Sequence, residues 1–339
     1  DSTLRAGYMK EAARRIVAAG LTHITDAGLG PDDVAALAAL QASGEVPVRF
    51  SVMVADRPDA LDHFLPLGPQ IDTAGMLDVR AVKFYMDGAL GSRGAALLEP
   101  YADSPGSSGL FLQDAEAYKE KVQRTKEAGF QVATHCIGDA AVRRALGVYG
   151  ELLGGVNDLR WRIEHAQVVH RNDADAFAQY TVIPSVQPTH ATSDMYWAGQ
   201  RLGRNRVRRA YMYRTLQEQL GWLPLGTDFP VEGISPLRTY YAAVARKDVE
   251  GYPEEGFQAD EALDRLSALK GMTGWAALAC FREQDLGQIA AGFRADLTVL
   301  DRNPLTVPVE ALLGTEVLQT WIGGAQVFER KPGSAVPSP

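Results

Sequence analysis

The chain has 339 residues, of which 46% are apolar and 22% are charged, a composition typical of a soluble globular protein. Its net charge of -8 argues against a nucleic-acid partner, because phosphate binding needs a basic face, and no apolar run is long enough for a membrane span. The two cysteines, Cys136 and Cys280, are too few for a disulfide framework, so we expect a cytoplasmic protein. The chain starts at Asp1 rather than Met, which leaves room for a signal peptide upstream.

Helical patterns alternate with short apolar segments along most of the chain. The predicted helices cover residues 4–19, 31–42, 115–128, 140–153, 173–179, 207–217 and 237–246. The predicted strands cover residues 21–25, 48–54, 79–85, 131–134, 160–164, 182–186 and 223–226. This alternation predicts an α/β fold, a (β/α)8 TIM-type barrel. Because seven strands are found where eight are needed, either one strand is missed by this prediction or strand one is absent from this chain, and we favour the second explanation.

The last part of the chain changes character. Residues 287–301 and 317–329 alternate like antiparallel strands, and the second segment bends at Gly323 and Gly324. We interpret residues 1–286 as barrel strands two to eight and residues 287–330 as the C-terminal part of a small β-sandwich. Residues 331–339 are rich in Pro and Ser and are predicted to form a flexible tail.

Titratable residues gather at the predicted strand ends, where the loops of such a barrel converge on an active site. His135, His165 and Asp228 lie at or just after strand ends, and Lys83 lies within a strand. A single histidine is more commonly structural. Three histidines at strand ends, His135, His165 and His190, joined by Asp228 and Lys83, predict a metal site.

Lys83 has two interpretations. Inside the apolar segment AVKFYM its ammonium group loses hydration, which lowers its pKa. In the first interpretation it is a buried lysine paired with Asp87 or Glu164. In the second, the neutral amine takes up CO2 and becomes a carbamate that bridges two metal ions.

Six segments, in order, resemble the amidohydrolase superfamily, and most closely its YtcJ-like branch of N-acyl and N-formyl amide hydrolases (amidohydrolase family 3). They are KFYMDGALGSR, THCIGD, RIEHAQ, SVQPTH, GTDFPV and GQIAAGFRADLTVLD. The resemblance implies that Lys83 is the carboxylated bridging lysine and that His135 and His165 bind one metal ion. It implies that Asp228 is both a metal ligand and a proton shuttle, and that the cofactor is one or two divalent ions, with zinc expected.

The implied reaction is hydrolysis of a C–N bond other than a peptide bond, in a small N-acyl or N-formyl amide. A metal-bound hydroxide would attack the carbonyl carbon while Asp228 acts as general base and then general acid. The alternative is a truncated or degenerate barrel that binds a small ligand, or serves as a structural subunit, without catalysis. Metal content discriminates between these functions, and a homo-oligomer is compatible with either.

The chain departs from the family at one place. The family has a His-x-His pair on its first barrel strand, and this chain has no such pair. His23, in LTHITDAG, corresponds to the second strand and is interpreted as structural. We therefore expect a missing N-terminal segment to supply the first strand and its histidines.

Four residues are weaker candidates for substrate binding. Arg93 would contact a substrate carboxylate or carbonyl, or form a structural salt bridge. Gln187 and His190 would hydrogen-bond to the scissile amide. Trp222 would line an apolar acyl or aryl pocket, although such residues are as often plain packing.

Overall fold

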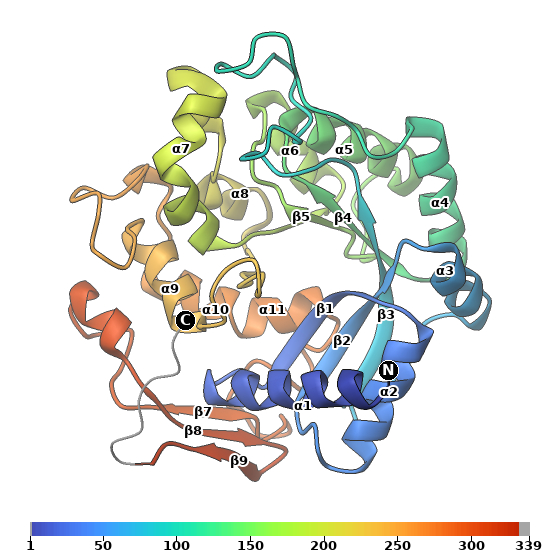
Figure 1. Ribbon diagram of the computed structural model, residues 1–339, viewed down its shortest axis with the longest axis vertical. Helices are drawn as coiled ribbons and strands as arrows, with labels where there is room; N and C mark the ends of the chain where they lie inside the picture. Colours follow the sequence, from blue (N-terminus) through green and yellow to red (C-terminus); the bar gives the residue numbers. More distant parts are fainter. Residues whose placement is uncertain (1, 332–339) are drawn as a thin grey trace.

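Six parallel strands of the computed structural model form one sheet that wraps part of the way around a barrel, with helices outside it (Figure 1). The structure describes residues 2–331. Each strand pairs with the next in chain order: β1 (His23–Leu29), β2 (Arg49–Ala55), β3 (Leu77–Tyr85), β4 (Gln131–Cys136), β5 (Arg162–His165) and β6 (Ile183–Ser185). The predicted α/β fold with a partial TIM-type barrel is confirmed.

Eleven α-helices lie within the described residues. They are α1 (Ser2–Ala18), α2 (Pro31–Ala42), α3 (Pro58–Phe64), α4 (Ala115–Glu127), α5 (Asp139–Leu153), α6 (Arg171–Gln179), α7 (Pro188–Arg206), α8 (Tyr213–Leu220), α9 (Pro236–Ala245), α10 (Arg265–Gly271) and α11 (Gly274–Ala279). Local signals set several of their ends. Asp114 caps α4 by accepting hydrogen bonds from two backbone N–H groups, and Gly154, with φ 74°, ends α5. No helix in this part of the chain is both long and apolar enough to cross a membrane.

The prediction of one helix over residues 207–217 is wrong about where the helix begins and ends. Residues 207–209 form a 3-10 turn and α8 begins only at Tyr213, while α7 begins directly after β6. Pro188 suits the first turn of α7, where its missing N–H has no helical partner to lose. Gly203, with φ 75°, interrupts the helix near its end. The early start of α7 places residue 190 beside the strand ends.

The seventh predicted strand is reduced to a single parallel bridge. Leu225 bridges Val186, and the N–H of Gly226 donates to the Val186 carbonyl at 2.9 Å. Pro224 has no N–H, and the N–H of Leu225 donates to the Gly271 carbonyl at 2.9 Å instead. Among residues 2–331, β1 pairs only with β2, so the sheet stays open between β1 and this segment.

A second, antiparallel sheet follows the barrel, with the order β7 (Leu297–Leu300), β8 (Val317–Ile322) and β9 (Ala325–Glu329). The strand predicted from residue 287 begins only at β7, because Gly287 and Gly292 adopt φ values of 83° and 91°. Figure 1 shows α1 lying along this sheet, and Thr320 Oγ1 donates to the Val17 carbonyl at 2.7 Å. Apart from its first residue, the predicted tail lies outside the described residues.

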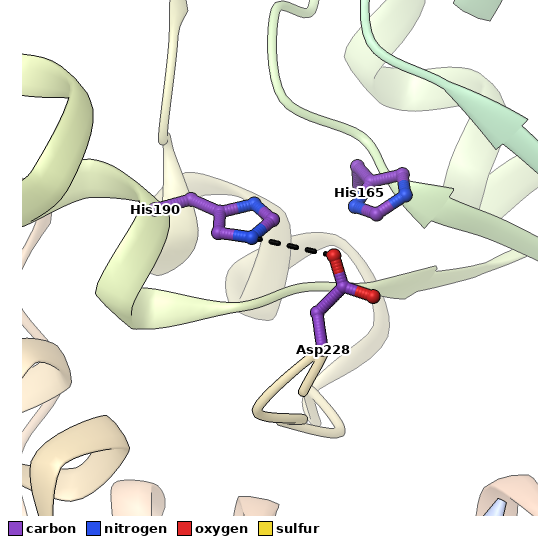
Figure 2. Close-up of side chains that lie close together, drawn as sticks. All are labelled: His165, His190 and Asp228. Atoms are coloured by element: carbon purple, nitrogen blue, oxygen red, sulfur yellow. Dashed lines mark ion pairs between the residues drawn. The ribbon is translucent and has the colours of Figure 1, made fainter. Parts of the chain in front are cut away.

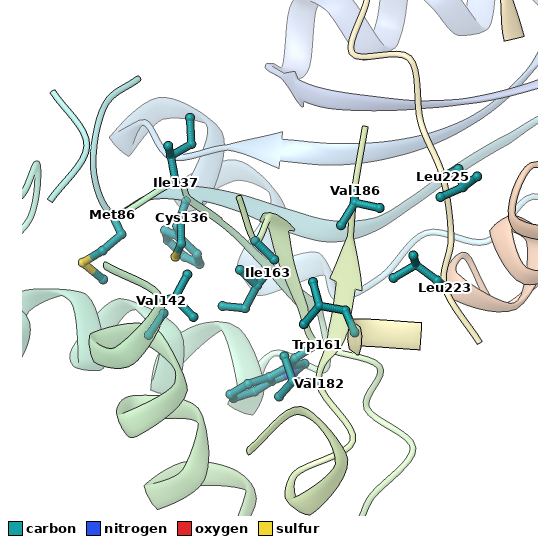
Figure 3. Packing of buried hydrophobic residues seen from close by; sticks show 14 of the residues in the cluster. Met86, Cys136, Ile137, Val142, Trp161, Ile163, Val182, Val186, Leu223 and Leu225 are labelled. Carbon is teal, nitrogen blue, oxygen red and sulfur yellow. The ribbon is translucent and has the colours of Figure 1, made fainter. Parts of the chain in front are cut away.

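The apolar core lies between the parallel sheet and its helices (Figure 3). Ile163 of β5 and Val142 of α5 are fully buried there, and Val182, Leu223 and Leu225 extend the same cluster to the segment that follows α8. Burying a Val, Leu or Ile side chain contributes roughly 1.5–3 kcal/mol. This packing holds the strand ends in place even where the hydrogen-bond ladder is incomplete.

His23 gives folding a dependence on pH. Its Nε2 lies 2.9 Å from Ser51 Oγ, and burial, together with the charges of Arg282 and Arg49, lowers the pKa of His23 to about 4. The unfolded histidine takes up a proton near pH 6.5, so stability is lost as the pH falls from 7 to 5. Between pH 7 and pH 5, the free energy of unfolding of His23→Gln should fall by about 2 kcal/mol less than that of the wild type. Urea denaturation at the two pH values measures this difference.

The control for this prediction is His63→Gln, because His63 is exposed. It should leave the pH dependence of unfolding as it is in the wild type. An unchanged pH dependence in His23→Gln would contradict the assignment.

Candidate metal centre

The strand register brings the predicted residues of β3, β4 and β5 to one edge of the sheet. Tyr85 pairs with His135, and Cys136 pairs with His165. The His135 and His165 ring centroids are 4.6 Å apart, and the Tyr85 ring lies 5.6 Å from that of His135. Lys83 Nζ is 4.6 Å from the centre of the Tyr85 ring. These side chains therefore share the carboxyl ends of the strands.

The tightest group of potential ligands at this edge is formed by His165, His190 and Asp228 (Figure 2). One ligand atom from each lies within 4.8 Å of the other two, and no other three His, Cys, Asp or Glu side chains among residues 2–331 meet so closely. His190 Nε2 is 3.4 Å from Asp228 Oδ2. His190 comes from the first turn of α7, a position that the sequence assigned to substrate binding.

Gln187 determines which ring nitrogen of His165 has a lone pair available to a metal ion. Its Oε1 lies 2.7 Å from His165 Nδ1, while its Nε2 donates to the Ser185 carbonyl at 3.2 Å. Since the oxygen faces the ring, His165 Nδ1 carries the proton and Nε2 keeps its lone pair. Gln187 therefore orients His165 as a potential metal ligand, and both ends of the Gln187 amide are occupied.

Replacing Gln187 with Leu should weaken zinc binding by roughly 10–100-fold, because the ring of His165 loses the partner that sets its orientation and tautomer. Titration of the purified protein with Zn2+ in a calorimeter measures this change. Gln123→Leu is the matched control, since Gln123 bonds only to Glu127 on the surface of α4. Equal affinities in the two variants would contradict the role of Gln187.

Two side-chain contacts hold the first turns of α7 and so the position of His190. Asp194 accepts a hydrogen bond from Gln167 Nε2 at 3.1 Å, which ties α7 to the loop after β5. Ser193 Oγ donates to Glu232 Oε1 at 2.6 Å, which ties α7 to the loop that carries Asp228. The three potential ligands are thus braced against one another.

Burial controls the charge of the histidines. It lowers the pKa of His165 well below its usual range, and the neighbouring His135 and His190 rings lower it further. Burial also lowers the pKa of His135 to about 4. At His190 burial acts in the same direction, but the contact and charge of Asp228 outweigh it and raise the pKa. His135 and His165 are therefore neutral near pH 7, the form in which imidazole binds a metal.

Lys83 has no carboxylate partner, so the predicted pairing with Asp87 or Glu164 is wrong. Glu164 pairs with Arg162, with Oε1 2.6 Å from Nε, and Asp87 accepts hydrogen bonds from backbone N–H groups after β3 and β4. Lys83 forms no ion pair within the described chain. Burial lowers the pKa of Lys83, although the negative charges of Glu164 and Asp228 oppose this shift.

The donor set fits a divalent metal ion. Within residues 2–331, His135 Nε2 is buried without a hydrogen-bond partner, and its distance from Asp87 Oδ1 is 3.6 Å. Leaving a buried polar group unpaired costs about 1–3 kcal/mol. Imidazole nitrogen with carboxylate oxygen is a ligand combination that zinc accepts. Bound metal would satisfy these side chains.

Two predicted substrate residues, Arg93 and Trp222, are not part of this group of potential ligands. Arg93 makes a bidentate contact with Asp103, at 3.1 and 2.9 Å, which is the structural salt bridge that the sequence left open. Trp222 precedes the segment 223–226 whereas Asp228 follows it, so the structure places Trp222 toward the opposite end of the barrel. A substrate role for Arg93 stays a prediction.

Comparison with known proteins agrees with this geometry. The sequence profile described as the Amidohydrolase family matches residues 3–328, nearly the whole chain. The chain belongs to the amidohydrolase family. As a family member it combines a partial TIM-type barrel with potential metal ligands at the strand ends.

Relatives of this amidohydrolase extend the comparison. The putative amidohydrolase YtcJ of Bacillus subtilis is 31% identical over 293 residues, covering 85% of this chain and 54% of that protein. N-substituted formamide deformylase of Arthrobacter pascens is 26% identical over 326 residues, covering 93% and 58%. The crystal structure of an uncharacterized metal-dependent hydrolase from Pyrococcus horikoshii has a TM-score of 0.81 and 29% identity, covering 91% and 62%. The chain spans about half the length of the curated relatives that it matches.

Proposed function

We propose that the protein hydrolyses a C–N bond other than a peptide bond, in a small N-acyl or N-formyl amide, with a divalent metal, zinc, as cofactor. The observation that carries this proposal is the meeting of His165, His190 and Asp228 at the carboxyl ends of the barrel strands. The similarity to an N-substituted formamide deformylase supports an amide as the substrate. The buried, unpaired thiols of Cys136 and Cys280 suit a cytoplasmic protein.

The residues have separate tasks in this reaction. A divalent metal held by His165, His190 and Asp228 would polarise the amide carbonyl and would make a nucleophilic water available at neutral pH. Asp228, whose side chain is 33% exposed, accepts the proton of that water at a carboxylate oxygen and delivers it to the leaving nitrogen. Lys83 is buried and forms no ion pair with the residues that the structure describes. It is suited to carry a carbamate, because its amine is more easily deprotonated than that of an exposed lysine.

The test is a screen of N-formyl and N-acyl amines with the purified, zinc-loaded protein, in which release of the free amine is measured. Hydrolysis that stops when a chelator removes the metal and returns when zinc is added supports the proposal. A protein that binds about one equivalent of zinc and hydrolyses no amide would instead be a ligand-binding barrel.

A further inference from the structure

We propose that the hydroxyl of Tyr85 donates a hydrogen bond to the carbonyl oxygen of the bound amide and stabilises the negative charge that develops there. This inference rests on the proposed amide hydrolysis and adds a catalytic residue to it. Tyr85 is the last residue of β3, two positions after Lys83.

The alternation of β3 points Tyr85 into the barrel. Phe84, between Lys83 and Tyr85, is fully buried on the helix side, where its ring meets that of Tyr118 in α4 at 5.9 Å. Successive side chains of a strand lie on opposite faces, so Lys83 and Tyr85 share the interior face. The short distances from the Tyr85 ring to Lys83 Nζ and to His135 agree with this placement.

Tyr85 lies where the buried site opens to solvent. Lys83, one step deeper on the same face, is 5% exposed, whereas Tyr85 is 41% exposed. The backbone at this position is held, because the carbonyl of Tyr85 accepts a hydrogen bond from Gln113 Nε2 at 2.9 Å. A substrate that reaches His165, His190 and Asp228 from the open end of the barrel therefore passes the phenol of Tyr85, whose backbone is fixed in position.

The hydroxyl of Tyr85 is uncommitted and remains a donor. It forms no hydrogen bond within residues 2–331. A phenol keeps its proton near pH 7 and can donate it in a hydrogen bond. The carboxylates around the Tyr85 side chain include those of Asp228, Asp26 and Asp56. The same carboxylates offer no N–H or O–H of their own to a developing oxyanion when they are ionised.

Several other donors near the site are already occupied. The Nδ1–H of His165 donates to Gln187, whose own amide donates to the Ser185 carbonyl. Arg93 is engaged by Asp103. The phenol of Tyr85 is thus a donor without a hydrogen-bond partner at this edge of the described barrel. A donor aimed at a developing oxyanion acts chiefly in the transition state.

The experiment compares Tyr85→Phe with the wild type in the zinc-loaded protein, using an amide that the wild type hydrolyses. Removing one such donor should reduce kcat by on the order of 10²-fold, with KM changed by less than about 3-fold and zinc content unchanged. Tyr8→Phe is the control, since Tyr8 is 73% exposed on α1 and should behave as wild type.

Binding gives a readout that does not depend on turnover. A phosphonamidate, in which a tetrahedral phosphorus replaces the amide carbon, should bind Tyr85→Phe more weakly than the wild type. The ratio of the two affinities should be about the same as the ratio of the two kcat values, while the amine product should bind both proteins equally. Wild-type kcat and wild-type phosphonamidate affinity in Tyr85→Phe would overturn the inference and leave amide hydrolysis standing. A zinc-loaded wild type that hydrolyses no amide would overturn the proposed function, and with it the role of Tyr85.

Discussion

Replacing Asp228 with Asn should reduce the turnover of the zinc-loaded protein by on the order of 10²–10⁴, the usual contribution of a positioned acid–base group. The amide keeps the size of the side chain and one oxygen that can face a metal, but it cannot take the proton of water. Asn also tolerates the left-handed backbone at this position, where φ is 57°, so the loop should keep its shape. Steady-state kcat and zinc content, measured on the same samples, check the prediction.

Asp32→Asn is the control for this substitution, because Asp32 is a surface carboxylate on α2 whose side chain is 90% exposed. It should keep turnover within a few-fold of the wild type. Wild-type turnover in Asp228→Asn would exclude Asp228 as the acid–base group. A zinc content as low as that of His165→Ala would mean that Asp228 acts mainly as a ligand.

The strand ends of the site could be predicted from the sequence because they follow from chain order alone. Parallel strands place their carboxyl ends at one edge, so Lys83, His135 and His165 had to share that edge once the alternation of strands and helices was recognised. Asp228 follows for the same reason, even though its strand is reduced to one bridge at Leu225.

The partners of these residues could not be predicted, because they depend on where helices begin and on which side chains compete for one acceptor. His190 reaches Asp228 only because α7 starts at Pro188, immediately after β6. Gln187 was expected to bind the substrate amide, yet both ends of its side chain are used by His165 and Ser185. Neither contact leaves a periodic signal in the sequence.

A similar limit applies to the junction between the two sheets. Arg49 in β2 and Asp296, just before β7, are 247 positions apart, and the antiparallel pattern of the tail says nothing of an ion pair with the barrel. The guanidinium and carboxylate meet in a bidentate contact, at 2.6 and 3.0 Å, with side chains only 3% and 6% exposed. Asp296 also accepts a hydrogen bond from the N–H of Gly323 at 2.8 Å.

Asp296→Ala should therefore lower the free energy of unfolding by about 3–5 kcal/mol, the usual effect of leaving one member of a buried ion pair without its counter-charge. Urea denaturation at pH 7 measures this loss. Asp59→Ala is the matched control, because the Arg57–Asp59 pair is more than half exposed and should contribute no more than about 1 kcal/mol. The double variant Arg49→Met/Asp296→Leu separates charge from packing, since replacing both partners with apolar groups removes the unpaired charge and should recover most of the stability. If the double variant is no more stable than Asp296→Ala, the loss reflects the hydrogen bond to Gly323 and the packing of the two sheets rather than the isolated charge of Arg49.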